Sequence, residues 1–169
     1  MIDPTTMFDF TYGLYVVSAT GKEGSSGCVI NTATQVTATP IQVAVSVNKE
    51  NVTCERMLEA GHFALTVLDN TVDMPFIGRF GFRSSRDIDK YEGIDVATSD
   101  LGDVYATDHA CAMIAVKVLE TLDMGTHLLF VGEVVQTKKL GDAAPLTYTE
   151  YHTTLKGKTP PKAASYVAD

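Results

Sequence analysis

One segment, IQVAVSVN at Ile41–Asn48, alternates regularly between apolar and more polar side chains. Its three valines fall on one face of an extended chain, while Ser46 and Asn48 fall on the other. A two-residue period is typical of a strand with one buried face, and such a strand needs neighbours for its backbone hydrogen bonds. The chain therefore has to build a sheet around this segment.

Further strand patterns follow at short spacing, and helix patterns are few. We expect strands at 12–19, 27–31, His62–Leu68, 113–122 and 127–137, and short helices at about 51–60 and 73–80. Asn51 or Thr53 is the expected cap of the first helix, and Gly61 is its expected terminator. The turn at 123–126 predicts a hairpin between the last two strands. Short strands with so little helix favour an antiparallel barrel over alternating β and α units. The 169 residues carry no repeat and no linker rich in Pro and Ser, so we expect 1–169 to form a single domain.

Charge and cysteine content limit the partners and the compartment. The formal net charge of −8 argues against nucleic acid and against an anionic membrane, because both attract basic surfaces. No segment has the apolar length that spans a bilayer, and the acidic MIDPTTMFDF stretch lacks the features of a signal peptide. Cys28, Cys54 and Cys111 form no CxxC pair, which predicts reduced thiols, a cytoplasmic location and no metal site.

Several familiar catalytic motifs do not occur in the chain. There is no GxGxxG after a strand, no P-loop lysine motif and no GxSxG elbow. Each cysteine is open to two interpretations, a catalytic nucleophile or a buried structural thiol. Cys54 is the best placed for a nucleophile because it begins a predicted helix, whose dipole lowers the pKa of a thiol.

A polar stretch, NTATQVTATP at 31–40, separates two apolar strand patterns. A plain hairpin needs only a few turn residues, so this many small polar side chains calls for an explanation. One interpretation is a segment that hydrogen-bonds the edge of a flat ligand, and the other is a solvated strand end rich in Thr. The residues concerned are Asn31, Thr32, Thr34, Gln35, Val36 and Thr37.

Two further stretches are suited to an anion. In SVNKENVT (46–53) a strand ends just before a helix starts, so free N–H groups, Lys49 and the Thr53 hydroxyl lie together. In FRSSRDIDK (82–90) two arginines flank two hydroxyls, and guanidinium groups match phosphate oxygens. The alternatives are an ordinary helix cap and surface ion pairs with Asp87 and Asp89. His127 comes just after the predicted tight turn, which places it at a rim of the barrel. Its role there is either functional or structural.

Taken together, these stretches resemble the flavin reductase-like family with the FMN-binding split barrel, and most of all its NADH:FMN oxidoreductase and flavoredoxin branch. The resemblance rests on YGLYVVSA, NTATQVTATPIQVAVSVNKEN, FGFRSSRDIDKYEG, THLLFVGEVV and LTYTEYHTTLKGKTPP in that order. It implies a mostly β fold, a six-stranded antiparallel split β-barrel with a few short helices. It also implies a homodimer with FMN near the subunit interface.

The resemblance also implies roles for individual residues. His127 matches a histidine near the flavin or nicotinamide, whose part is either catalytic or structural. Residues expected to bind FMN are Asn31, Thr32, Thr34, Gln35, Val36, Thr37, Ser46, Val47, Asn48, Lys49, Thr53, Phe82, Ser84, Ser85, Arg86, Lys90, Tyr151 and His152.

The implied function is a flavin reductase that accepts a hydride from NAD(P)H onto FMN and passes electrons to free flavin or to an acceptor protein. The alternative from another class is a non-enzymatic FMN flavoprotein that carries electrons between protein partners, and a third is a barrel that binds another ligand. Because the chain has no CxxC pairs, a rubredoxin-type iron carrier has to be a separate protein. The sequence leaves open NADH or NADPH, tight or exchanging FMN, and the acceptor.

Overall fold

The structure is a computed structural model and describes residues 1–167. Its strands are β1 (Tyr15–Gly21), β2 (Gly24–Ile30), β3 (Ala33–Ala38), β4 (Ile41–Asn48), β5 (His62–Leu68), β6 (Val96–Thr98), β7 (Val104–Ala106), β8 (Ala110–Asp123) and β9 (His127–Lys139). Its helices are the 3-10 helix η1 (Pro4–Asp9) and the α-helices α1 (Val52–Ala60), α2 (Met74–Gly81) and α3 (Tyr148–Thr153).

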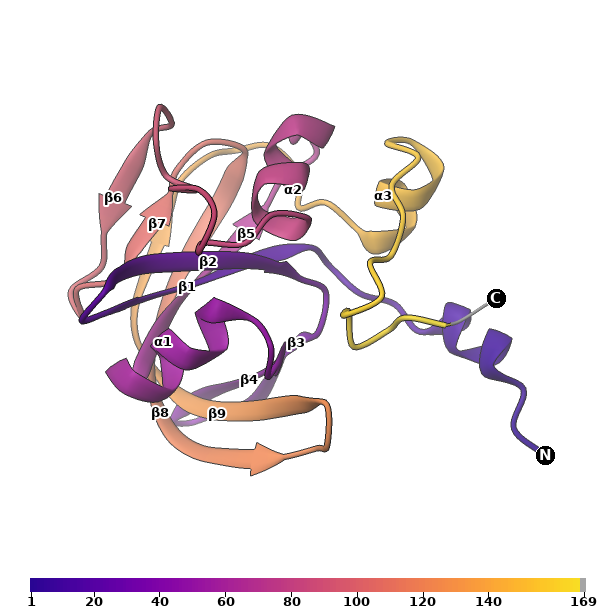
Figure 1. Cartoon of the computed structure of the whole chain (residues 1–169), viewed down its shortest axis with the longest axis horizontal. Coiled ribbons are helices and arrows are strands. Elements are labelled where there is room, and N and C mark those ends of the chain that lie inside the picture. Colours follow the sequence, from indigo (N-terminus) through magenta and orange to yellow (C-terminus); the bar gives the residue numbers. More distant parts are fainter. Residues whose placement is uncertain (168–169) are drawn as a thin grey trace.

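Seven of the strands form one antiparallel sheet that curls around a core (Figure 1), in the order β2-β1-β5-β8-β9-β4-β3. The mostly β, antiparallel fold is thus confirmed. The β8–β9 hairpin forms at the predicted turn, and the alternating strand β4 lies inside the sheet, paired with both β9 and β3. β6 and β7 form a separate two-stranded ribbon that the sequence patterns did not indicate.

The expected number of six strands is lower than the seven of the main sheet. The additional strand is β3, which comprises most of the polar stretch at 31–40. It pairs with β4 from Ala33 opposite Val45 to Ala38 opposite Ile41, with a bulge between Gln35 and Thr37. Two causes explain it: threonine favours extended backbone, and the edge of β4 that β9 leaves free needs backbone partners.

The predicted helices form where their caps indicate. The Asn51 side chain accepts a hydrogen bond from the Thr53 N–H at the start of α1, and Gly61 ends the helix in the left-handed conformation at φ 71°. α2 begins after Asp73, whose carboxylate accepts from the Phe76 N–H. α3 was not expected, although Thr147 and Glu150 form a capping box at its start.

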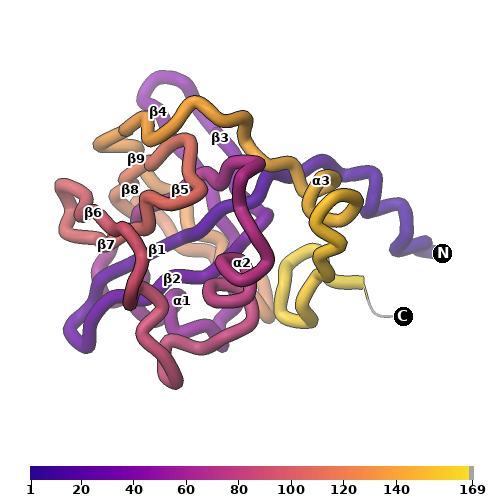
Figure 2. Tube along the Cα trace, turned by 90° about the horizontal axis from the view of Figure 1, so that it is seen from above, coloured from indigo at the N-terminus to yellow at the C-terminus, as the bar shows by residue number. Residues whose placement is uncertain are grey.

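Two apolar clusters place the functional cleft. Inside the barrel, Val17, Val45, Phe63 and Phe130 pack with Met57 of α1, which closes one end. Outside it, α2 packs with β1, β2 and the C-terminal region through side chains such as Leu14, Phe76, Phe80 and Tyr151. Seen from above (Figure 2), α3 and both termini lie on the same side of the barrel. This side holds the cleft described below.

Gly132 on β9 provides a test of the barrel packing. A Cβ there would lie 2.4 Å from Cγ1 of Val116 and 2.5 Å from the backbone oxygen of Lys117. We expect Gly132→Ala to lower the free energy of unfolding by about 1–3 kcal/mol, measured by urea denaturation. Gly78→Ala in α2 is the matched control, because its Cβ meets nothing within 4 Å, and it should raise stability by up to about 1 kcal/mol. Unchanged unfolding of Gly132→Ala would contradict this packing.

Candidate functional site

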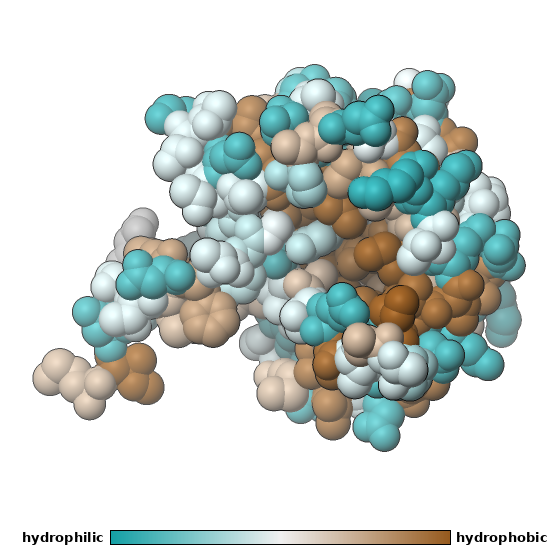
Figure 3. All heavy atoms as spheres, turned by 180° about the vertical axis from the view of Figure 1, so that it is seen from behind, coloured by the Kyte–Doolittle hydropathy of each residue, from teal (hydrophilic) through white to brown (hydrophobic). Residues whose placement is uncertain are grey.

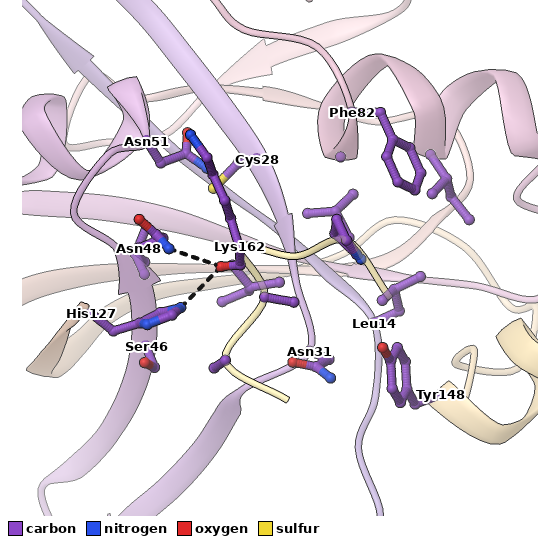
Figure 4. A pocket seen from close by; sticks show the side chains of 18 of the residues that line it. Leu14, Cys28, Asn31, Ser46, Asn48, Asn51, Phe82, His127, Tyr148 and Lys162 are labelled. Carbon is purple, nitrogen blue, oxygen red and sulfur yellow. Dashed lines mark hydrogen bonds between the residues drawn. The ribbon is translucent and has the colours of Figure 1, made fainter. Parts of the chain in front are cut away.

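The largest concentration of predicted site residues lines a cleft between the barrel and the C-terminal region (Figure 4). Its polar wall comes from the end of β4, the start of β9 and the residue before α1. Its apolar floor comes from Leu14, Ile77 and Phe82. The cleft has an empty volume of about 570 Å³, including space open to solvent. An apolar pocket with a few convergent polar groups is the usual form of a ligand site.

Two hydrogen-bond donors of this wall converge on one oxygen atom. Asn48 and His127 are opposite each other across β4 and β9. Nδ2 of Asn48 and Nε2 of His127 each lie 3.1 Å from the backbone oxygen of Lys162 (Figure 4). Nδ1 of His127 lies 2.8 Å from the Thr126 hydroxyl, so a neutral imidazole protonated at Nε2 satisfies both contacts. The pair is therefore built to hold a carbonyl oxygen.

The C-terminal strap, defined as residues 160–166, supplies that oxygen and forms one wall of the cleft. Besides the Lys162 carbonyl, Ser165 Oγ accepts from Nδ2 of Asn31 at 2.5 Å. The Lys162 ammonium forms an ion pair of 2.6 Å with Glu50. Three polar side chains of the cleft wall, Asn31, Asn48 and His127, are thus hydrogen-bonded to the strap.

Outside the residues that line the cleft, the structure joins the two stretches predicted to suit an anion, and Ser85 and Arg86 line a separate hollow. The Ser26 hydroxyl lies 2.8 Å from both the Thr53 hydroxyl of α1 and the Ser85 hydroxyl. Arg86 forms an ion pair with Glu55 in the first turn of α1. The start of α1 and the loop after α2 are therefore held together, with hydroxyls and a guanidinium beside the positive end of a helix.

The predicted residues divide into those that line the cleft and those that do not. Lining it are Asn31, Ser46, Val47, Asn48, Phe82, His127 and Tyr151. Thr32 lines a shallow neighbouring hollow together with Ser46 and Asn48. Thr53 is fully buried, and Ser85 is half-buried. Ser84 accepts a hydrogen bond from the Arg86 N–H at 3.2 Å, within the loop after α2.

Other predicted residues lie outside the cleft of the single chain. Thr34, Gln35, Val36 and Thr37 are on the exposed strand β3. Lys49 forms an ion pair of 2.5 Å with Asp123. His152 lies 2.9 Å from the backbone oxygen of Gly157 and lines a separate groove beside η1. Lys90 is buried beneath α2 and β2, away from the cleft surface.

The cleft also contains residues that sequence reasoning did not assign to it. Asn51 was considered only as a helix cap, yet it lines the cleft. Tyr148 and Lys162 arrive from the C-terminal region, and no local pattern shows where that region folds back. The proline pair before Lys162 in LKGKTPPK was the available signal, because consecutive prolines extend the chain.

A comparison with protein families matches residues 7–154 to the flavin reductase like domain. The chain belongs to this flavin reductase family. One similar member is a ferric-chelate reductase (NAD(P)H) from Archaeoglobus fulgidus, 43% identical over 98% of both chains. Another is a high molecular weight rubredoxin from Moorella thermoacetica, 37% identical over 98% of this chain and 72% of that protein. The structure of an NADH:FAD oxidoreductase from Streptomyces globisporus superposes with a TM-score of 0.77, at 22% identity over 87% of this chain and 91% of that chain.

In this member of the flavin reductase family, the three cysteines are buried structural thiols. All three are buried, and burial raises the pKa of Cys28 and of Cys54 to about 11. Burial also raises the pKa of Cys111. The helix start at Cys54 therefore does not produce a reactive thiolate, because burial outweighs the dipole.

We expect the native protein to resist a thiol-specific reagent near pH 8. With a pKa of about 11, only roughly one Cys28 or Cys54 thiol in a thousand is ionised at that pH, and thiolate is the reactive form. Counting the modified thiols by mass spectrometry, before and after denaturation, checks this. Rapid labelling of folded Cys54 would restore the nucleophile interpretation.

Proposed function

We infer that this member of the flavin reductase family is an NAD(P)H-dependent flavin reductase that uses FMN. The observation that carries the inference is a cleft with a convergent donor pair for a carbonyl oxygen, Asn48 and His127. Hydroxyls, a guanidinium and the start of α1 form a cluster outside that cleft, close in sequence to its lining residues Asn51 and Phe82. A flavin ring has carbonyl oxygens and FMN ends in a phosphate, so the donor pair and this cluster fit the two ends of that molecule. The name of the Archaeoglobus relative, a ferric-chelate reductase (NAD(P)H), agrees with the dependence on NAD(P)H.

The chain's own residues bind and orient, because FMN, when bound, supplies the hydride-accepting chemistry. Asn48 and His127 would donate to a ring carbonyl and so orient the ring. The start of α1, Ser85 and Arg86 would hold the phosphate. Leu14, Ile77 and Phe82 provide an apolar wall that keeps water from the ring. His127 acts here as a donor to the ring, a role that needs no proton transfer.

Anaerobic titration of the FMN-loaded protein with NADH, and separately with NADPH, tests the function. We expect stoichiometric loss of the oxidised flavin absorbance with at least one of the two nucleotides. Excess FMN should also raise the melting temperature, since a ligand that binds only the folded state stabilises it by about 2.7 kcal/mol at 100 times Kd. An unchanged melting temperature in excess FMN would contradict the flavin assignment.

The second candidate, an FMN flavoprotein that moves electrons between proteins, is favoured by the similarity to a high molecular weight rubredoxin. This chain covers 72% of that relative's length. We propose a separate rubredoxin-type protein as an electron acceptor. Stopped-flow mixing distinguishes the candidates: rapid bleaching by a nicotinamide nucleotide indicates the reductase. Bleaching only by a reduced protein partner indicates the carrier.

The proposal includes a homodimer of single-domain subunits, 1–169, in the cytoplasm. The N-terminal arm, defined as residues 1–10, supports it. η1 has no buried residue, and Met7, Phe8 and Phe10 are exposed. Figure 3 shows this arm projecting from the body, where it has little to pack against within its own chain. An exposed apolar arm gains stability when a second copy covers it.

Three buried free thiols agree with a reducing compartment. None of the helices among residues 1–167 has the length and apolar character needed to cross a membrane.

We expect the double variant Phe8→Asp, Phe10→Asp to shift the dimer to a monomer, because two charges would then enter the interface. Light scattering after size-exclusion chromatography measures the mass directly. The control is Thr5→Asp, Thr6→Asp, which adds the same charge to polar positions of the same arm. A doubly charged apolar variant that stays dimeric would show that the arm is not the interface.

An FMN-bound crystal structure would show whether the β3 residues contact the flavin. Thr34, Gln35, Val36 and Thr37 remain proposed flavin contacts. They lie on an edge strand whose outer side has no backbone partner among residues 1–167.

A further inference from the structure

Lys90 is a charged residue in a position where charges are rare. Only 3% of its surface is exposed, and burial lowers its pKa. Among residues 1–167, no carboxylate lies within ion-pair distance of its ammonium group. A buried cation without a counter-ion is costly, and it persists only where backbone acceptors or a ligand compensate it.

The ammonium group binds two backbone segments that are far apart in the sequence. It donates to the oxygen of Gly27 on β2 at 2.8 Å and to the oxygen of Phe80 in the last turn of α2 at 3.1 Å. A cation at the C-terminal end of a helix is stabilised by the helix dipole and satisfies a free carbonyl. Lys90 therefore joins the end of α2 to β2.

Both joined segments continue into the anion-suited cluster of hydroxyls. Ser26, next to Gly27, contacts the hydroxyls of Thr53 and Ser85. Phe82, two residues after Phe80, lines the cleft, and Ser85 follows in the same loop. A change in the distance between Gly27 and Phe80 therefore moves Ser26 relative to Ser85.

The Lys90 backbone is itself held by hydrogen bonds and by the packing of its neighbour Tyr91. Nη1 of Arg79 donates to the backbone oxygens of Lys90 and Glu92, at 3.4 and 2.6 Å. The neighbouring Tyr91 donates to the Ser18 hydroxyl at 2.9 Å and packs so closely on Gly27 that a Cβ there would lie 2.5 Å from its phenol oxygen. The positive charge is therefore held between β2 and the end of α2, at Gly27 and Phe80.

The geometry points to Lys90 as a positioning residue that gives the site its preference for phosphorylated flavin. It holds the hydroxyls of Ser26 and Ser85 in place through Gly27 and Phe80, and its positive charge, which no carboxylate among residues 1–167 neutralises, acts on the phosphate through the protein without touching it. Direct contact with the phosphate at the surface belongs to Arg86, which is exposed. This inference rests on the proposed function and specifies which part of FMN the buried charge serves.

The test compares FMN with riboflavin, which has the same ring and lacks the phosphate. Affinities are measured by quenching of flavin fluorescence for the wild type, Lys90→Met and Lys90→Arg. We expect Lys90→Met to weaken FMN binding about tenfold or more while riboflavin affinity changes less than about twofold. Lys90→Arg keeps the charge and should retain most of the wild-type preference for FMN.

A structural role alone would weaken both ligands equally in Lys90→Met, and that result overturns the inference. If Lys90→Met does not fold, the wild-type protein is tested by NMR instead. The ¹⁵N resonance of the Lys90 ammonium is assigned by its absence from the spectrum of Lys90→Arg. FMN should shift this resonance and riboflavin should not; equal shifts overturn the inference. Failure of the wild type to bind either flavin would instead overturn the proposed function. A wild type that binds both equally would overturn only the role of Lys90.

Discussion

Replacing Arg86 with alanine is expected to weaken FMN binding about 10- to 100-fold and to leave riboflavin binding nearly unchanged. A charge-assisted hydrogen bond to a phosphate contributes about 1.5–3 kcal/mol, which corresponds to that range. In the structure the Arg86 guanidinium pairs only with Glu55 among residues 1–167, and both side chains are about half exposed, at 58% and 46%. Its remaining donors are therefore available to a ligand.

The same variant should fold normally, because exposed ion pairs contribute at most about 1 kcal/mol. Fluorescence titration with each flavin, together with the melting temperature of the ligand-free protein, separates binding from stability. Arg83→Ala is the matched control: it is an exposed arginine in the same loop, with no ion pair among residues 1–167. Equal losses in the two variants would show a general effect of charge rather than a contact at Arg86.

The parts of the fold predicted correctly are those specified by local sequence. β4 follows from its two-residue period, α1 from the cap at Asn51 and the terminator Gly61, and the β8–β9 hairpin from its turn. In each case the information lies within a few residues of the element. The added strand β3 depends instead on the free edge of β4, which is a property of the assembled sheet.

The candidate site was predicted less completely, for the same reason. Asn48 and His127 were named separately, and the sequence does not show that they converge on one oxygen, because β4 and β9 are far apart in the chain. Lys90 was expected among the FMN-binding residues, as part of the cationic stretch at 82–90. Its burial depends on how α2 packs on β2, which no local pattern records.

Ending the chain after Thr159, and so removing the C-terminal strap, is expected to accelerate FMN binding about tenfold. The strap supplies the Lys162 carbonyl to Asn48 and His127, the donors assigned to the flavin ring, and Ser165 to Asn31. The ring can use those donors only after the strap has moved. When a binding-competent state is only partly populated, the apparent affinity falls by that fraction, and hydrogen bonds of about 0.5–1.5 kcal/mol each are enough for a tenfold effect.

The truncation keeps the contacts that anchor the chain before the strap. The Tyr151 hydroxyl donates to the Lys158 oxygen at 2.9 Å, and Tyr148 contacts Thr159, so α3 should remain docked. Lys162→Ala is the matched control, because it removes the exposed ion pair with Glu50 and retains the backbone carbonyl; its rate should stay near that of the wild type. Stopped-flow fluorescence gives both rates. Slower and weaker binding by the truncated chain would contradict this competition and would mean that the strap contacts bound flavin, because losing a contact weakens binding whereas removing a competitor frees donors.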